Sequence, residues 1–403
     1  MDKQRADLTF KHNLKRGRHG WVRLTPAYSV KVVHQILDDY PDIMTIMDPF
    51  SGTGTTGLVA GQRGLYSDLF DVNPFLVWLA NVKCANYTPA QLRRVDEAGI
   101  EIIHRAQNIA SDDDLWFAPI SNIDRWWSYD RLVVLGKFFK SLNEVLPTQS
   151  KEKDLLLVGF CRLIMRWSNA AFNHQSMSFK EHNVTQRMFD EQGEIHQDFL
   201  HDLRDITAAA AEQISSEVRA HLNDSREIVG FPEQYDAVIT SPPYVNRMSY
   251  VRELRPYMYW LGYLDTPRDA GELDWEAIGG TWGVATSRLN DWMPQNQVRS
   301  DRGGLETIVE RIAQNSVILS RYVHKYFNDM SSHFASLYDN VAPGGHIFYI
   351  IGNSKFYDTV VPAEKLYADL MTEHGFENTK ISTIRKRNSK KELYEFLVSA
   401  RKS

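Results

Sequence analysis

Short apolar runs alternate with helical patterns along the first part of the chain. Apolar residues recur at helical spacing from 31 to 40, and the run IMTIMDPF at 43–50 then predicts a buried strand. A second run, LYSDLFDVNP at 65–74, predicts a strand that ends at Asp71. Strands that alternate with helices in this way are typical of a mostly parallel sheet whose faces are covered by helices.

The second half of the chain continues this pattern and adds a strand pair at its end. Strands are predicted at 217–223, at DAVITS (236–241) and at HIFYIIGNS (346–354), the last one after the turn APGG. The C-terminal segments TKISTIRKR and ELYEFLVSARK predict two antiparallel strands joined by a basic turn. The fold class is therefore α/β: a Rossmann-like, mostly parallel sheet with an antiparallel C-terminal strand pair and a helical insertion.

Two long segments lie outside the predicted sheet. Residues 75–215 are helical in character, with few proline or glycine breaks, and they hold Trp116, Trp126, Trp127 and Trp167. Residues 265–304 are loop-rich and carry three tryptophans. We therefore divide the chain into core parts at 1–74, 216–264 and 333–403, a helical insertion at 75–215 and a loop-rich insertion at 265–332.

Composition places the chain among globular, cytoplasmic proteins. Hydrophobic residues make up 43% and charged residues 24% of the 403 residues, and no apolar run approaches the ~18 residues of a membrane span. The charged N-terminus lacks the apolar core of a signal peptide. Cys84 and Cys161 form no CxxC pair, which favours a reduced, intracellular protein. The histidines show no metal-ligand spacing with cysteine, so no metal site is expected.

The charge distribution changes this picture locally. The net charge of −5 is not that of a typical nucleic-acid binder. Basic residues cluster at 11–19 and 385–391, and Arg247, Arg252 and Arg255 follow a Ser-Pro-Pro-Tyr segment. Any one of these clusters is explained by a solvated charged surface. Three clusters around one candidate site favour a polyanionic partner.

A glycine-rich turn follows the first predicted strand. The segment DPFSGTGT opens a helix of small residues, and Asp71 ends the next strand. Glycines let the backbone pass close to a ligand, and an acidic residue at the second strand end can accept hydrogen bonds from ribose hydroxyls. The turn is neither GxGxxG nor the lysine-bearing phosphate loop, so it favours a nucleoside without phosphates.

The strand DAVITS runs directly into two prolines. A strand in the middle of a sheet cannot tolerate proline, because its ladder needs the backbone N–H. Ser-Pro-Pro-Tyr at 241–244 is therefore a rigid step at the carboxyl end of the strand, where open α/β sheets bind ligands. The alternative is an ordinary turn that carries two prolines.

Together, DPFSGTGTT, DVNP and TSPPY resemble the motifs of the S-adenosylmethionine-dependent DNA amino-methyltransferases (cytosine-N4/adenine-N6 type) of restriction–modification systems. The resemblance covers most of the catalytic core, and it implies a Rossmann-like methyltransferase fold and S-adenosylmethionine as cofactor. It also implies that the segment RLTPAYS at 23–29 closes over the methionine end of the cofactor. By this resemblance the cofactor-binding residues are Thr25, Tyr28, Asp48, Pro49, Phe50, Gly52, Gly54, Thr55, Asp71 and Asp224.

The resemblance divides these residues along the cofactor. Asp48, Gly52 and Gly54 would line the methionine moiety, and Asp71 would bind the ribose. Asp224, in NDSREI just before the Pro-Pro strand, would meet the adenine ring. The alternative for Asp224 is a cap of a helix or turn.

The same resemblance makes Ser241, Pro242, Pro243 and Tyr244 the catalytic residues. An exocyclic base amine is a poor nucleophile because its lone pair is delocalised into the ring. The Ser241 hydroxyl and the Pro242 carbonyl can accept the two amine protons and free that lone pair, while the prolines hold both acceptors in place. Tyr244 can stack on the base, which must leave the duplex.

The partner implied is double-stranded DNA with a flipped base, and a companion restriction endonuclease goes with such a system. The Thr-Ser-Pro-Pro-Tyr form favours cytosine N4 as the target atom, with adenine N6 as the alternative. An RNA or protein-glutamine amino-methyltransferase is an alternative within the enzyme class. A silent DNA-binding subunit is a further alternative, but the intact Gly52, Asp71 and Ser241 argue against it. A cytosine-C5 enzyme needs a nucleophilic cysteine beside a proline, whereas Cys84 and Cys161 are interpreted as packing residues.

The motif order leaves target recognition open. The cofactor half precedes Ser-Pro-Pro-Tyr here, whereas many members of the family place the catalytic half first. We expect the two segments outside the sheet, 75–215 and 265–304, to recognise the target, with basic residues that meet phosphates.

Overall fold

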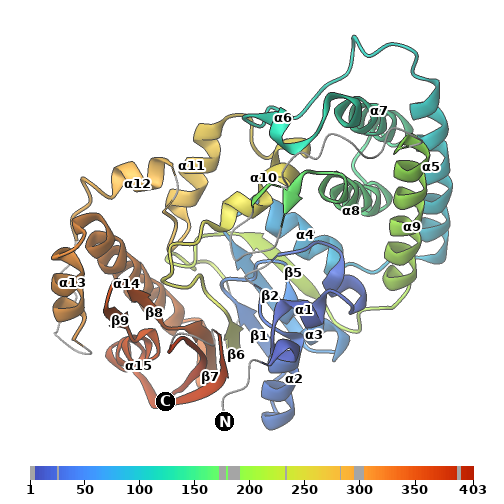
Figure 1. Cartoon of the computed structure of the whole chain (residues 1–403). Coiled ribbons are helices and arrows are strands. Elements are labelled where there is room, and N and C mark those ends of the chain that lie inside the picture. The colour runs from blue at the N-terminus through green and yellow to red at the C-terminus, as the bar shows by residue number, and fades with distance from the viewer. Residues whose placement is uncertain are drawn as a thin grey trace.

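The computed structural model describes residues 5–24, 27–171, 178–179, 191–231, 234–281, 283–294, 304–387 and 392–403. Figure 1 shows a sheet in the middle of the molecule. One group of helices, coloured cyan to green, extends beyond one side of the sheet, and the orange to brown helices lie on the other side.

The central sheet has seven strands in the order β10-β11-β7-β6-β1-β2-β5. The five strands from β7 to β5 pair in parallel, and β11 and β10 are antiparallel. The predicted fold class is therefore confirmed. The strands are β1 (Thr45–Asp48), β2 (Tyr66–Asp71), β5 (Val218–Leu222), β6 (Tyr235–Thr240), β7 (Val341–Gly352), β10 (Phe376–Lys386) and β11 (Tyr394–Lys402).

Helices cover both faces of the sheet, which is why its inner strands read as continuous apolar runs. On one face Ala237 and Ile239 of β6 pack with α2 (Val30–Asp39) and α3 (Thr55–Gln62). On the other face Val238 packs with α14 (Val317–Tyr338) and α15 (Ala363–Glu373). Successive residues of β6 thus serve opposite faces, as the strand period of two requires.

The described part of 75–215 forms a helical group with its own apolar core, which also includes α10 (Tyr250–Trp260). Trp126, Trp127 and Trp167 are buried in this core, and only Trp116 is exposed. The indole of Trp127 donates to the Ile164 carbonyl at 2.8 Å. Trp126, Trp127 and Trp167 therefore stabilise the group instead of facing a partner. Its elements are α4 (Pro74–Cys84), α5 (Pro89–Asn108), α6 (Ile123–Trp126), α7 (Tyr129–Val145), α8 (Lys151–Arg166), β3 (Ala170–Ala171), β4 (Ser178–Phe179) and α9 (Glu191–Ala210).

Much of the described part of 265–332 is helical, although the sequence predicts a loop-rich insertion there. Its helices are α11 (Pro267–Glu276), α12 (Val284–Arg288), α13 (Leu305–Ala313) and most of α14. Thr266 and Asp269 make a capping box at the start of α11, and Pro267 occupies its first turn. Both features are helix-start signals that can be read in the sequence.

The segment APGG is also more regular than predicted. It belongs to β7, which begins at Val341, and its register against β6 shifts between Tyr235 and Ala237. The glycines thus lie in an irregular part of a paired strand and do not form a separate turn.

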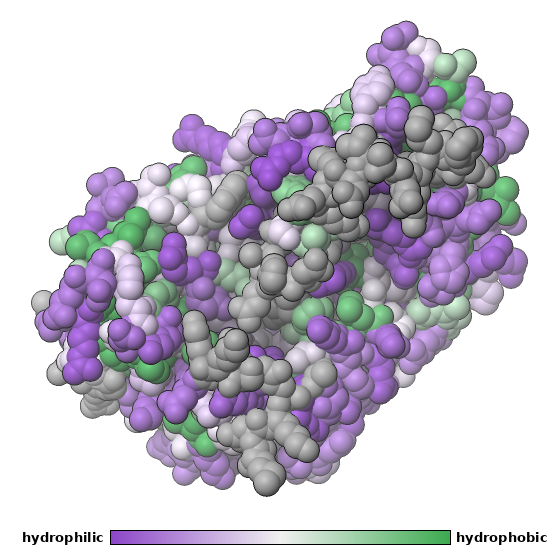
Figure 2. All heavy atoms as spheres, viewed as in Figure 1, coloured by the Kyte–Doolittle hydropathy of each residue, from purple (hydrophilic) through white to green (hydrophobic). Residues whose placement is uncertain are grey.

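The remaining short elements lie at the two ends of the chain. They are η1 (Ala6–Leu8), α1 (Phe10–Asn13), η2 (Gly17–Gly20), β8 (Ser354–Phe356) and β9 (Thr359–Val361). Hydrophilic side chains dominate the face in Figure 2, and apolar ones gather by α12 and α13. Within the described ranges, no helix combines the length and the apolar character needed to cross a membrane.

Candidate functional site

A cavity with about 900 Å³ of empty space opens at the carboxyl edge of the parallel strands. Its walls come from the segments that follow β1, β2, β5 and β6, and from the end of α11. The chain runs from β1 to β2 on one side, and β6 pairs with β1 on the other, so the cavity lies where the strand order reverses. Open α/β sheets bind their ligands at such a point.

Most of the predicted site residues meet in this cavity. Its lining includes Tyr28, Pro49, Phe50, Gly52, Thr55, Asp71, Asp224, Ser241 and Pro243. Asp48, Gly54, Pro242 and Tyr244 are not part of the lining. Thr25 lies outside the described residues. The two motifs that are far apart in the sequence, the glycine-rich turn and Ser-Pro-Pro-Tyr, therefore border one space.

The glycine-rich turn is held against the end of β2. Gly52 and Gly54 have φ of 51° and 76°, and a Cβ at Gly54 would stand 3.0 Å from the Cβ of Ala80. The Gly52 N–H donates to Asp71 Oδ2 at 3.0 Å, and the Asn73 N–H donates to Asp71 Oδ1 at 2.9 Å. Each carboxylate oxygen keeps a lone pair for a ligand hydroxyl. Burial raises the pKa of Asp71 to about 7.

Asp48 is fully buried and acts behind the cavity wall. Its Oδ1 accepts from the Thr240 hydroxyl at 2.6 Å and from the Phe50 N–H at 3.1 Å. Its Oδ2 accepts from the Tyr28 hydroxyl at 3.2 Å. Burial raises the pKa of Asp48 to about 6, and these hydrogen bonds act in the opposite direction. Asp48 therefore joins the two strand ends and the Tyr28 segment without facing a ligand.

The Ser-Pro-Pro-Tyr step begins directly after β6, which ends at Thr240. The Ser241 hydroxyl donates to the Ile350 carbonyl of β7 at 2.9 Å. Because its proton is used in this way, the oxygen presents its lone pairs to a donor. The Pro243 carbonyl is already occupied, since it accepts from the Tyr326 hydroxyl at 2.6 Å.

Tyr244 is anchored away from the cavity lining. Its hydroxyl donates to Glu395 Oε1 of β11 at 2.8 Å, and Glu395 also binds Arg385. The Arg387 guanidinium carbon stands 5.2 Å from the centroid of its ring. The aromatic side chain of this region that does line the cavity is Tyr250, whose hydroxyl accepts from the Tyr244 N–H at 2.8 Å. Tyr250 was not predicted from the sequence, whereas Arg387 lies in the basic cluster at 385–391.

Asp224 lines the cavity and also caps a turn, so both readings of this residue have a structural basis. Its Oδ1 accepts from the Arg226 N–H at 2.9 Å, which is the turn cap. Burial acts to raise the pKa of Asp224, but the hydrogen bond and charge of Arg226 outweigh it and lower the pKa. The carboxylate is therefore charged and held in place.

Several lining residues were not predicted. They come from the segment before α2, the strand ends, α4, α10 and the end of α11, and they include Leu24, Asn73, Leu76, Asn223, Val251, Leu254, Leu273, Glu276, Ala277 and Ile278. The residues of α11 are the largest departure from the prediction, because the segment 265–304 was expected to recognise the target and instead also lines the cavity.

The first basic cluster contains a structural arginine. Arg18 is 2% exposed. Its guanidinium donates to the carbonyls of Lys83 and Ala85 at the end of α4, and to those of Ala209 and Ala210 at the end of α9. Cations at helix C-termini are favourable because the last carbonyls lack partners. Arg18 therefore joins two helix ends and is not available to a polyanion.

No group of three or more metal-ligating side chains occurs among the residues that the structure describes. Both cysteines are buried and unpaired, and burial raises the pKa of Cys84 to about 12. Neither thiol is activated as a nucleophile.

The sequence matches no family model. Among curated proteins, the type II methyltransferase M.BsoBI of Geobacillus stearothermophilus is 21% identical in an alignment of 450 positions, which covers 98% of this chain and 86% of that protein. The type II methyltransferase M.AvaI of a Nostoc species is 22% identical over 94% of this chain and 83% of its own length. M.MvaI of Kocuria varians, also a type II methyltransferase, is 23% identical over 60% of this chain and 56% of its own length.

The resemblance to the methyltransferases of restriction–modification systems is therefore confirmed by relatives that match nearly the whole chain. Among solved structures, the rRNA methyltransferase aviRa from Streptomyces viridochromogenes aligns with 99% of this chain and 94% of its own at 12% identity. Its TM-score is 0.30, which is too low to carry an argument.

Proposed function

We propose that this protein is a site-specific DNA methyltransferase that moves a methyl group from S-adenosylmethionine to the exocyclic amine of a flipped base, with cytosine N4 as the target. One observation carries the proposal: a single cavity is bordered by Gly52 and Asp71 on one side and by Ser241 on the other. A donor and an acceptor of a methyl group need such a shared space. The type II methyltransferase relatives support the same reaction class.

The cavity fits a nucleoside-containing cofactor. Asp71 would accept hydrogen bonds from the ribose hydroxyls, since each of its oxygens keeps a lone pair beside the bonds from Gly52 and Asn73. Asp224 would meet the adenine end. When bound, S-adenosylmethionine supplies a methyl group on a positively charged sulfur.

The chain's own part in the reaction is to hold the amine. Ser241 donates its proton to the Ile350 carbonyl, so its oxygen can accept one amine proton. The second acceptor would be the Pro242 carbonyl, while the Pro243 carbonyl accepts from the Tyr326 hydroxyl. With both protons bound, the nitrogen lone pair is freed toward the methyl donor. No covalent enzyme intermediate is needed, in agreement with the buried, unactivated Cys84 and Cys161.

The proposed substrate is double-stranded DNA, and the target base must leave the stack to reach the cavity. The form Thr240-Ser241-Pro-Pro favours cytosine N4, and adenine N6 is the alternative within the same chemistry. A DNA substrate is consistent with the cytoplasmic location that the cysteine usage predicts, and a companion restriction endonuclease would cut the same sequence.

The test is to incubate the purified protein with methyl-labelled cofactor and unmethylated double-stranded DNA, and to analyse the nucleosides. We expect label in N4-methylcytosine. Label only in N6-methyladenine would overturn the choice of base and keep the amino-methyltransferase assignment. RNA and a protein substrate, offered in parallel, test the other two acceptors. A silent subunit would label none of them.

A further inference from the structure

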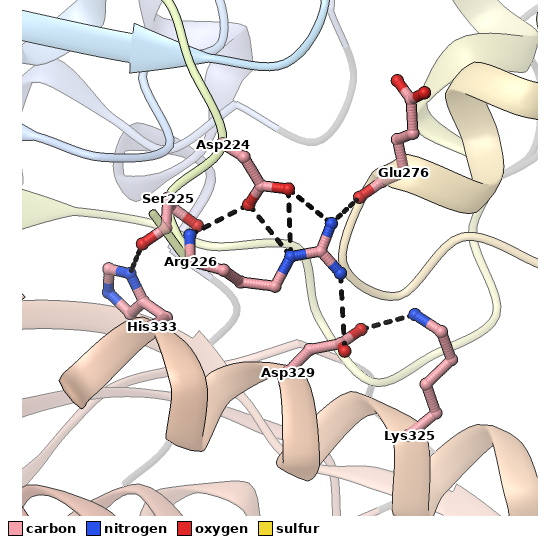
Figure 3. A network of polar contacts seen from close by, with 7 residues as sticks. All are labelled: Asp224, Ser225, Arg226, Glu276, Lys325, Asp329 and His333. Carbon is pink, nitrogen blue, oxygen red and sulfur yellow. Dashed lines mark hydrogen bonds and ion pairs between the residues drawn. The ribbon is translucent and has the colours of Figure 1, made fainter. Parts of the chain in front are cut away.

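Arg226 lies at the point where the loop after β5, the end of α11 and helix α14 meet (Figure 3). Its guanidinium donates to both carboxylate oxygens of Asp224, with Nε–oxygen distances of 2.9 and 3.0 Å. Its Nη2 also donates to the Glu276 carbonyl at the end of α11, at 2.8 Å. Its Nη1 stands 3.4 Å from Asp329 Oδ1 on α14. The Arg226 side chain is only 22% exposed, so its contacts with Asp224 and Asp329 are partly shielded from solvent.

Helix α14 holds this arrangement from below. Asp329, 9% exposed, accepts from Lys325 at 2.6 Å. The Lys325 ammonium stands 4.6 Å from the ring centroid of Trp275, the neighbour of Glu276 on α11. Two cations from outside α11, Arg226 and Lys325, thus contact its last turn. The positive charges of Arg226 and Lys325 are balanced by the negative charges of Asp224 and Asp329.

The loop that carries Asp224 has a second anchor on α14. His333 Nδ1 stands 2.9 Å from the Ser225 carbonyl, and its Nε2 stands 2.6 Å from the Tyr349 hydroxyl. A carbonyl only accepts, so Nδ1 carries the proton and Nε2 accepts from the tyrosine. Burial lowers the pKa of His333 to about 4, which keeps the ring neutral.

Two of the three residues that Arg226 contacts, Asp224 and Glu276, line the cavity. Asp224 borders it from the end of β5, and Leu273, Glu276, Ala277 and Ile278 form the wall that α11 contributes. This wall is not part of the sheet edge. The Arg226 guanidinium joins the two, because it donates both to Asp224 and to the Glu276 carbonyl. The planar fork of arginine has five donors, so it can serve a carboxylate, a carbonyl and a second carboxylate together. A lysine at this position cannot.

We propose that Arg226 is a positioning residue for the adenosine half of the cofactor. It fixes the Asp224 carboxylate at the cavity edge and holds the α11 wall against it, so that the adenine end of the cavity is formed before the cofactor arrives. This inference rests on the proposed function. Pre-organisation of this kind raises affinity because less ordering remains to be done on binding.

The experiment compares three variants with the wild-type protein. Arg226→Gln removes the charge and the fork, and Arg226→Lys keeps the charge alone. Arg219→Gln is a matched control, because Arg219 binds Glu217 two positions before it at 2.9 and 2.8 Å, outside the cavity. Calorimetry with S-adenosylhomocysteine and with adenosine measures the cofactor side, and steady-state kinetics separates KM from kcat.

We expect R226Q to weaken binding of S-adenosylhomocysteine and adenosine by about tenfold or more, the scale of one charge-assisted hydrogen bond. KM for S-adenosylmethionine should rise by a similar factor, while kcat at saturating cofactor and KM for DNA stay within about twofold. R226K should fall between R226Q and the wild type, and R219Q should match the wild type. A purely structural role would lower kcat and the thermal midpoint without this split.

Unchanged affinity for both ligands in folded R226Q would overturn the inference. If R226Q fails to fold, Asp329→Ala decides, because it keeps the Asp224–Arg226 pair and removes the acceptor that α14 offers to Arg226. A rise in KM for S-adenosylmethionine alone supports the inference, and wild-type values overturn it. Failure of the proposed function is a separate result. In that case the wild-type protein itself does not bind S-adenosylhomocysteine.

Discussion

The Thr240 hydroxyl donates to Asp48 Oδ1 at 2.6 Å, across a separation of 192 positions in the sequence. This bond joins the strand that leads into Ser-Pro-Pro-Tyr to the strand that leads into the glycine-rich turn. The carboxylate that accepts it is fully buried. The two halves of the proposed site are thus bonded to each other behind the cavity as well as facing each other across it.

Loss of this bond should destabilise the protein. In Thr240→Val the shape is kept and the buried carboxylate loses one donor, so we expect the free energy of unfolding to fall by about 1–3 kcal/mol. Urea unfolding measures this loss. Thr372→Val, on the exposed side of α15, is the control and should change stability by less than about 0.5 kcal/mol. Equal values for the two variants would contradict a structural role for the bond.

Cofactor binding should depend on Asp71. Asp71→Ala removes the acceptor of the ribose hydroxyls and should weaken S-adenosylmethionine binding by roughly 1–3 kcal/mol, the scale for hydrogen bonds to a charged group. Calorimetry on the folded variant measures the change. Unchanged affinity would show that the ribose is bound elsewhere.

Cofactor affinity should also depend on pH, because burial raises the pKa of Asp71 to about 7. The ribose hydroxyls donate to the charged carboxylate, so binding favours the deprotonated form and the affinity should rise as the pH increases from about 6 to 8. Binding titrations across this range check the sign. Asp71→Asn should bind more weakly with a flatter profile, and an equally steep profile in this variant would assign the titration to another group.

Ser241 should matter for turnover and not for cofactor affinity. Ser241→Ala removes one of the two proposed acceptors of the amine protons, so kcat should fall by about 10²–10³-fold, as for other transition-state hydrogen bonds. The dissociation constant for S-adenosylhomocysteine should stay within about twofold of the wild-type value. The exposed, remote Ser215→Ala serves as the control for kcat. A variant with wild-type turnover would remove Ser241 from the mechanism.

Target binding should be sensitive to salt through basic residues near the step. Arg247 is exposed and follows Tyr244 closely, so we expect Arg247→Gln to weaken DNA binding for all sequences alike and to reduce the salt slope by about one. Arg219, 53% exposed on β5 and outside the segments expected to recognise the target, provides the control substitution Arg219→Gln. Identical slopes for wild type and R247Q would exclude a phosphate contact at this position. Point substitutions are preferable to deletion of 265–304, because α11 also walls the cavity.

The sequence by itself determined the sheet, its parallel character and the positions of both motifs. These features depend on local chemistry: apolar runs that must be buried on two faces, glycines that permit a tight turn, and prolines that end a strand. Since parallel strands bring their carboxyl ends to one edge, the sequence also placed Asp71, Asp224 and Ser241 near one another. The family resemblance added the expected role of each.

Only the tertiary structure decided which side chains face the cavity and which support it from behind. Asp48 and Tyr244 belong to the motifs just as Asp71 and Ser241 do. Asp48, however, accepts hydrogen bonds from Thr240 and Tyr28, and Tyr244 donates to Glu395, 151 positions away. The Trp126 and Trp127 indoles, which lie in a segment that was expected to recognise the target, fill a core. Such outcomes depend on contacts between elements distant in the chain, and no local pattern encodes those pairings.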